Sequence, residues 1–95
     1  MGALTLRLHT PEGYGKELEC DHVNLFARDN ALGEGGGSVG IRRSHCAAVI
    51  ALADNAKIEA KLDGRPVFTG AASGGFAMVK DDIVTVLTDH IEEVN

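Results

Sequence analysis

Apolar and polar residues alternate with a period of two at the start of the chain. In the segment Leu4–His9, three leucines alternate with threonine, arginine and histidine. Such alternation is typical of a β-strand that buries one face. Residues 10–15, TPEGYG, favour a turn, because proline fixes one backbone dihedral and glycine adopts conformations that other residues avoid. The sequence therefore predicts a strand followed by a turn.

The alternation returns after this turn, but its phase changes partway. Leu18 and Cys20 would share one face of a strand, whereas the next two apolar residues, Val23 and Leu25, would share the opposite face. A β-bulge at residues 21–22 would bring all four side chains onto one face. We therefore predict one bulged strand over this segment.

The middle of the chain contains one glycine-rich segment and one alanine-rich segment. Residues 28–38, RDNALGEGGGS, hold few apolar side chains, so we expect an exposed, mobile loop. This loop lacks the Gly-Lys-Ser/Thr ending of a phosphate-binding loop. In Ala47–Ala53, alanine and leucine favour a helix whereas Val49 and Ile50 favour a strand. The short length of the run favours the strand.

The stretch from Gly64 to Asp89 predicts an antiparallel meander of three strands. Its apolar runs are about five to seven residues long, which is the usual length of a strand. Asp63-Gly64 is a two-residue hairpin signal at its start, and Pro66 belongs at a strand start or a sheet edge. The predicted strands are Arg65–Ala71, Phe76–Lys80 and Ile83–Thr88, separated by Ser73-Gly74-Gly75 and Asp81-Asp82. Ser73-Gly74-Gly75 is either a structural kink or a direct partner contact.

Together these segments predict about eight to ten short strands and no helix longer than two turns. This pattern indicates an all-β fold, an antiparallel β-sandwich or flattened barrel. A chain of 95 residues has room for one core, so we predict a single domain over residues 1–95. Tryptophan is absent, and Phe and Tyr together number four (Phe 3, Tyr 1), so the core must be largely aliphatic.

Charge and composition exclude several classes of partner. A net charge of -5 argues against nucleic acid or an anionic membrane surface as the main partner, because both require clustered Lys and Arg. No apolar stretch approaches the roughly 18 residues of a membrane span, and no targeting segment is evident. We therefore expect a soluble, cytoplasmic protein with two reduced cysteines.

Candidate chemistry is sparse. Cys20, His22, His45 and Cys46 are residue types that suit tetrahedral zinc, although their spacing is not that of a known zinc finger. Unliganded side chains are the simpler interpretation, so we predict no metal and no cofactor. Ser44 beside His45 lacks the strand-to-helix turn that presents a nucleophilic serine, so we predict no catalytic residue.

The order of these segments resembles the N-terminal β-sandwich domain of the epsilon subunit of F-type ATP synthases. The family carries a motif of the form Gly-acid-aliphatic-Gly-aliphatic-x-Pro-Gly-His, to which residues 37–45, GSVGIRRSH, correspond. A Ser-Gly-Gly before an apolar strand matches residues 73–76, and an Asn-Val-Thr-Val-Leu-type strand matches residues 82–87, DIVTVL. The resemblance covers residues 3–89.

This resemblance implies a non-catalytic rotor subunit that docks on the gamma subunit and on the c-ring. Such a subunit helps to couple ion translocation to ATP synthesis at the periphery of the inner membrane. The implied partner-binding residues are Gly37, Ser38, Arg42, Arg43 and His45. For His45, a turn histidine that bonds the backbone is an equally open interpretation.

The chain departs from the family in two regions. The family has an acidic residue at the position of Ser38, Pro-Gly at Arg43-Ser44 and proline at Ala47, so the changes cluster where the family faces the rotor ring. Six residues follow Asp89, where the family usually carries a helical hairpin. We expect the inhibitory and ATP-sensing behaviour of that hairpin to be absent.

A second hypothesis follows from the altered motif. The chain could be a stand-alone small-molecule or metal-binding β-sandwich that kept the fold and lost the partner, since a fold alone does not fix a function. A pocket lined by His22, His45 and the two cysteines would favour this alternative.

Overall fold

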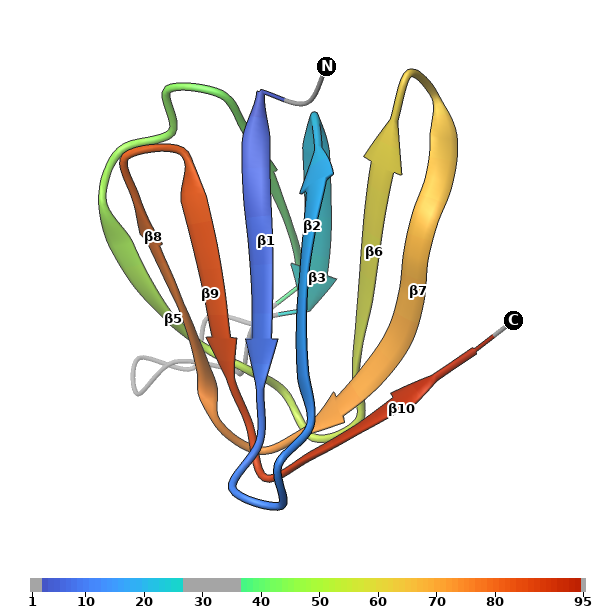
Figure 1. Ribbon diagram of the computed structural model, residues 1–95. Helices are drawn as coiled ribbons and strands as arrows, with labels where there is room; N and C mark the ends of the chain where they lie inside the picture. Colours follow the sequence, from blue (N-terminus) through green and yellow to red (C-terminus); the bar gives the residue numbers. More distant parts are fainter. Residues whose placement is uncertain (1–2, 27–36, 95) are drawn as a thin grey trace.

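The computed structural model describes residues 3–26 and 37–94, which form two five-stranded sheets packed face to face (Figure 1). Sheet A contains β1 (Leu4–His9), β2 (Gly15–Cys20), β5 (Ala48–Ala51), β8 (Phe76–Lys80) and β9 (Ile83–Leu87), in the order β2-β1-β9-β8-β5. Sheet B contains β3 (His22–Phe26), β4 (Ser38–Arg42), β6 (Ala56–Leu62), β7 (Arg65–Ser73) and β10 (His90–Glu93), in the order β10-β7-β6-β3-β4. The all-β sandwich predicted from the sequence is confirmed.

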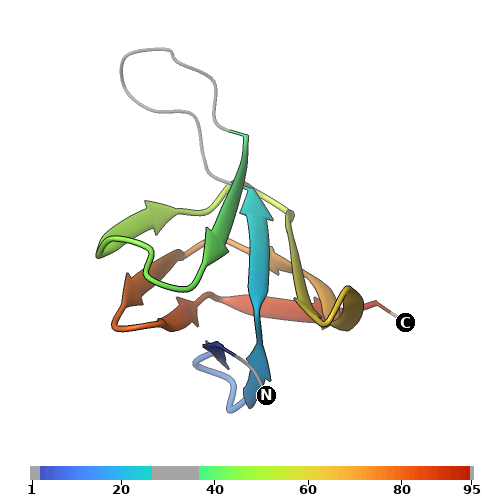
Figure 2. The same ribbon diagram turned by 90° about the horizontal axis from the view of Figure 1, so that it is seen from above.

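The core lies between the two sheets, which Figure 2 shows from above. It is built from the alternating inward side chains of both sheets. The three leucines of β1 are buried, as their alternation predicts, and they pack with aliphatic residues of the opposite sheet such as Val23 and Ile58. Phe68 is the aromatic residue of the buried cluster. The core is therefore largely aliphatic, in agreement with the composition.

The predicted bulge at residues 21–22 is wrong, because the chain changes sheets there. Cys20 ends β2 in sheet A, His22 begins β3 in sheet B, and the amide of Asp21 between them donates to the Lys61 carbonyl at 2.8 Å. The apolar side chains before and after the phase change therefore point into the same core, from opposite sheets. A register shift does occur elsewhere, between Ala60 and Lys61 of β6.

The predicted meander is also wrong in one respect. β8 and β9 pair as an antiparallel hairpin, but β7 belongs to sheet B and extends to Ser73. Gly74 and Gly75 have φ values of 74° and 98°, and they turn the chain from one sheet to the other. β9 then lies parallel to β1, whereas the other strand pairs of the described chain are antiparallel.

Several local predictions are confirmed. Asp63 and Gly64 both have positive φ, 53° and 77°, as a type I′ hairpin turn requires. Pro66 lies near the start of β7, outside the Gly70–Ser73 part that pairs with β10. The alanine-rich run forms the strand β5. Of the predicted glycine-rich loop, residues 28–36 lie outside the described part.

No helix in residues 3–26 or 37–94 is long and apolar enough to cross a membrane.

One buried hydroxyl joins the end of β9 to the crossing between the sheets. Thr88 is buried, and its Oγ1 lies 2.9 Å from the Ser73 carbonyl oxygen and 2.5 Å from that of Gly74. The hydroxyl donates to carbonyls that precede β8, so it fixes the crossing against the end of β9.

Replacing Thr88 by valine is expected to destabilise the protein by about 2 kcal/mol, because it removes a buried donor that the Ser73 and Gly74 carbonyls share. The free energy of unfolding from urea titration measures this change. Thr85→Val on the outer face of the same strand should change stability by less than about 0.5 kcal/mol. Equal costs for the two variants would contradict the role of the hydroxyl.

Candidate functional site: an apolar face on sheet A

The outer face of sheet A carries a group of apolar side chains on β5, β8 and β9, with Thr85 and Lys80 among them. Val49 is paired with Met78 across β5 and β8, and Phe76 is paired with Leu87 across β8 and β9. Val49 is 71% exposed, Phe76 39% and Met78 37%. We call this surface the apolar strip; it comprises Val49, Ala51, Phe76, Met78, Ile83 and Leu87.

The strip has a polar border on the two strands that follow it in the sheet. Arg7 of β1 and Glu17 of β2 face outward as cross-strand partners and form an ion pair at 2.5 Å. An apolar centre with a polar rim is the usual composition of a protein–protein interface. Exposed apolar side chains in a contiguous group indicate an interaction site more strongly than single exposed residues do.

The outer face of sheet B differs in character. Lys57, Glu59 and Lys61 alternate along the outward side of β6, and His22 and Asn24 face outward on neighbouring β3. These polar side chains are compatible with water. Phe26 on β3 and Val67 on β7 are also exposed, but among the described residues they lie on a face that is otherwise largely polar.

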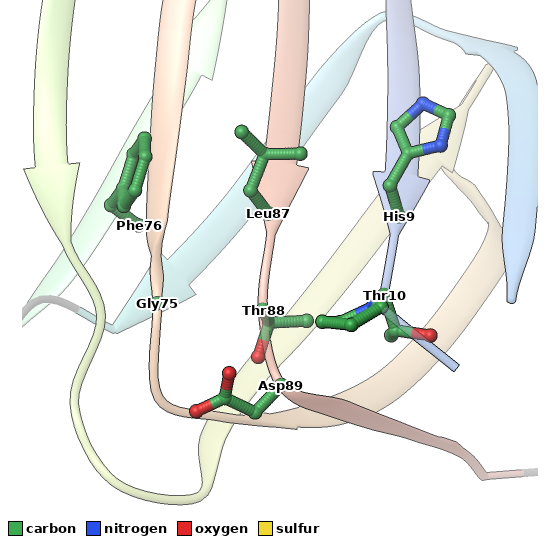
Figure 3. A pocket seen from close by; sticks show the side chains of 8 residues that line it. His9, Thr10, Gly75, Phe76, Leu87, Thr88 and Asp89 are labelled. Carbon is green, nitrogen blue, oxygen red and sulfur yellow. The ribbon is translucent and has the colours of Figure 1, made fainter. Parts of the chain in front are cut away.

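A cavity of about 380 Å³ lies at one end of the apolar strip, next to the crossing between the sheets. Figure 3 shows Phe76, Leu87 and His9 on three adjacent strands, with Asp89 beyond their ends. The cavity is lined by His9, Thr10, Pro11, Gly75, Phe76, Leu87, Thr88 and Asp89. Its apolar walls would accept an apolar side chain, and polar groups stand at its edge.

Gly75 shapes this cavity because no larger residue fits there. A Cβ at this position would lie 2.1 Å from the Leu87 carbonyl oxygen. The interpretation of Ser73-Gly74-Gly75 as a structural kink is therefore confirmed. Gly75 also lines the cavity, so a partner bound there would lie close to it.

The five residues that the family resemblance singles out lie on β4, the edge strand of sheet B, and in the segments next to its two ends. Gly37 and Ser38 are exposed at the start of β4, opposite Phe26, whereas Arg42 is exposed at its other end. Arg43 and His45 follow Arg42 in the turn beyond that end. The structure thus separates the set into two groups at opposite ends of one strand.

The turn that holds Arg43 and His45 is fixed against the β8–β9 hairpin. The Ser44 amide donates to Asp82 Oδ1 at 2.6 Å, and the His45 amide donates to the Arg42 carbonyl at 3.2 Å. His45 Nδ1 lies 2.8 Å from the Cys46 carbonyl oxygen. This contact confirms that His45 bonds the backbone, and it leaves Nε2 as the ring nitrogen for a partner.

The structure does not assemble the candidate metal ligands. Cys20 is buried in the core whereas Cys46 is exposed, and both are free thiols. The described residues contain no group of three or more His, Cys, Asp or Glu side chains placed to share a metal ion. The cavity beside His22 includes neither His45 nor a cysteine, so the pocket expected for the alternative function is not formed by these residues.

The two thiols should differ sharply in reactivity. Burial is the main cause that raises the pKa of the Cys20 thiol to about 11, so its reactive thiolate is scarce and shielded at neutral pH. We expect dithionitrobenzoate to label Cys46 rapidly and Cys20 only after unfolding. Rapid labelling of two thiols in the native protein would contradict the buried position, and Cys46→Ala should abolish the fast phase.

Structural comparison finds known proteins that are similar to this chain, whereas the sequence comparisons find none. No family model and no curated protein matches the chain. A solved structure from the Tetrahymena thermophila mitochondrial ATP synthase, central stalk and c-ring, aligns with a TM-score of 0.68 at 13% identity, covering 94% of this chain and 65% of that chain. One from the Euglena gracilis mitochondrial ATP synthase, OSCP/F1/c-ring in rotational state 1, aligns with a TM-score of 0.70 at 25% identity, covering 95% and 52% respectively.

These likenesses define the class of fold. The chain is a β-sandwich structurally similar to chains in mitochondrial ATP synthase structures that include the central stalk or the c-ring. It spans 65% and 52% of the two chains that it matches.

Proposed function

We propose that the protein is a non-catalytic rotor subunit of an F-type ATP synthase, equivalent to the N-terminal domain of the epsilon subunit. Three independent observations support this proposal: the ordered motifs of the sequence, the structural likeness to ATP synthase chains, and the apolar strip on one broad face. The strip is the observation that carries the function, because it gives the sandwich a surface that requires a partner.

The apolar strip is the surface that we assign to the gamma subunit. A stable interface covers on the order of 800 Å² per partner. Val49, Phe76 and Met78 are the exposed apolar side chains at its centre, and the cavity beside Phe76 would receive an anchoring side chain. Two packed sheets resist shear without any reactive group, which suits a part that transmits rotation.

The two ends of β4 are then assigned to different neighbours. Gly37 and Ser38 lie at one end, and Arg42, Arg43 and His45 lie at or beyond the other. We assign one end to the c-ring and the other to the gamma subunit, because the family resemblance implies contacts with both. In this role the protein sits at the periphery of the membrane within the synthase and couples ion flow to ATP synthesis.

Co-expression with the gamma subunit of the same synthase tests the proposal. We expect the two proteins to co-purify and to bind at micromolar concentration or tighter. If the protein binds neither the gamma subunit nor the assembled synthase at micromolar concentration, the rotor function is wrong.

One observation favours a second candidate function. The 380 Å³ cavity beside Phe76 lies within the size range of small-molecule sites, which would suit a stand-alone binding module. The cavity opens on the apolar strip, so the rotor function explains both features together. A small molecule that binds there and leaves gamma binding unchanged would favour the second function.

A further inference from the structure

Three basic side chains lie side by side across the outer face of sheet B. Arg42 of β4 is the direct cross-strand partner of His22 of β3, and His22 is in turn paired with Lys61 of β6. All three face away from the core. In a chain with a net charge of -5, counted with neutral histidine, Arg42 and Lys61 are the two members of the group that carry a positive charge. We call these three residues the basic row.

The basic row borders a hollow of its own. A cavity of about 550 Å³ is lined by Asp21, His22, Arg42, Lys61 and Gly64. The absence of a Cβ at Gly40 leaves space for the imidazole of His22, whose Nε2 would lie 3.1 Å from such an atom. The cavity is lined by charged, polar and glycine residues, and it is separate from the apolar strip.

The positive charges of the row are only partly neutralised by neighbouring acids. Lys61 Nζ lies 3.6 Å from Glu59 Oε1, which is a long contact for an ion pair. The Asp21 carboxylate accepts a hydrogen bond from the Asp63 amide at 2.9 Å, which occupies one of its oxygens. Across the described residues, Arg42 takes part in no side-chain hydrogen bond or ion pair. Its five donors are therefore available to a ligand.

We propose that the basic row binds a polyphosphate group. Arginine offers a planar fork that matches phosphate oxygens, lysine adds charge-assisted donors, and a histidine ring can add an N–H donor. Neighbouring strands are about 4.8 Å apart, so the row spans roughly 10 Å between the outer strands. That span exceeds what one phosphate can bridge and suits a linked di- or triphosphate.

The lining also predicts what the site does not recognise. Apart from the His22 ring, no aromatic and no aliphatic side chain lines the cavity, so it offers no anchor for an acyl chain or an apolar peptide side chain. The phosphate chain is the recognised element. Inorganic triphosphate and a nucleoside triphosphate should therefore bind with similar affinity. This site shares Arg42 with the partner contact proposed for the end of β4, but it does not use the apolar strip that is assigned to the gamma subunit.

Titration of the isolated ¹⁵N-labelled protein with inorganic triphosphate at constant ionic strength tests the proposal. We expect saturable shifts of the amide signals around residues 22, 42 and 61. Arg42→Ala should weaken binding about tenfold, because it removes charge-assisted hydrogen bonds. Lys57→Ala is the matched control, since it removes one positive charge from the same face and the same strand as Lys61. It should change the affinity less than twofold.

A second variant tests the site in the opposite direction. Asp21→Asn keeps an oxygen that can accept from the Asp63 amide but removes the negative charge that opposes the ligand. It should strengthen triphosphate binding about threefold, an effect that no loss of folding can imitate.

Several results would overturn the proposal. These are the absence of saturable shifts, equal weakening by Arg42→Ala and Lys57→Ala, and tenfold tighter binding of ATP than of inorganic triphosphate. Tighter binding of an octaglutamate peptide at the same amides would identify a protein-docking surface instead. Because the isolated chain is used, none of these outcomes bears on gamma binding.

Discussion

Replacing Gly75 by alanine is expected to destabilise the fold by roughly 4 kcal/mol. The new Cβ would lie 2.1 Å from the Leu87 carbonyl oxygen and 2.7 Å from the Thr88 Cα, and both are backbone atoms. They cannot move away without disturbing the end of β9, where the Thr88 hydroxyl also fixes the crossing between the sheets. The φ of 98° adds backbone strain for any residue with a Cβ.

Gly64→Ala is the matched control for this prediction. Gly64 also has a positive φ, 77°, but an added Cβ would meet no atom within 4 Å. Its cost should therefore be the conformational strain alone, about 1 kcal/mol. Urea unfolding monitored by circular dichroism measures both values. Similar costs at the two positions would show that the close approach at Gly75 is not what requires glycine.

Replacing Phe76 by aspartate is expected to weaken binding of the gamma subunit at least 100-fold. The change places a charge at the centre of the apolar strip and beside the cavity that we assign to an anchoring side chain. Burying an unpaired carboxylate and losing an aromatic contact together cost about 3 kcal/mol or more. Isothermal titration with purified gamma subunit measures the effect.

Val67→Asp is the control for the strip. Val67 is 41% exposed, nearly the same as Phe76 at 39%, but it belongs to β7 in sheet B. The same chemical change there should alter gamma binding less than threefold. If Val67→Asp weakens binding as much as Phe76→Asp does, the apolar strip is not the specific docking surface. Circular dichroism of both variants checks that the fold is retained.

The sequence predicts the individual strands well because strand patterning is local. The segment Leu4–His9 becomes β1 with the same bounds, and the hairpin at Asp63-Gly64 adopts the positive φ values that its residues favour. Alternation, turn residues and strand length act within a few neighbours, so they can be recognised without the rest of the chain.

The assignment of strands to sheets could not be predicted in the same way. The apolar side chains change from one side of the strand to the other at Cys20–Val23. A bulge within one sheet gives this pattern, and so does passage of the chain from one sheet to the other. The Gly-rich break at residues 73–75 has the same ambiguity. The non-local pairing of β3 with β6, and of β7 with β6 and β10, decides between them, and local patterns carry no information on those pairings.

The sequence does contain an indication of the apolar strip, which is hard to see because apolar and polar residues alternate along much of the chain. The segments FAMVK and IVTVL hold apolar residues in both phases, which indicates a strand with two apolar faces rather than one. One phase enters the core, and the other becomes the apolar strip. The sequence could not place the glycine-motif residues at the two ends of β4, because the length of that strand was not evident beside the glycine-rich loop.

A photo-reactive amino acid at Val49, compared with the same amino acid at Lys57, tests the central claim most directly. Val49 lies on the apolar strip, and Lys57 lies on the polar outer face of sheet B. In the assembled synthase, illumination should cross-link position 49 to the gamma subunit and leave position 57 without a gamma cross-link. Cross-linking to gamma from position 57 but not from position 49 would contradict the assignment of the docking face.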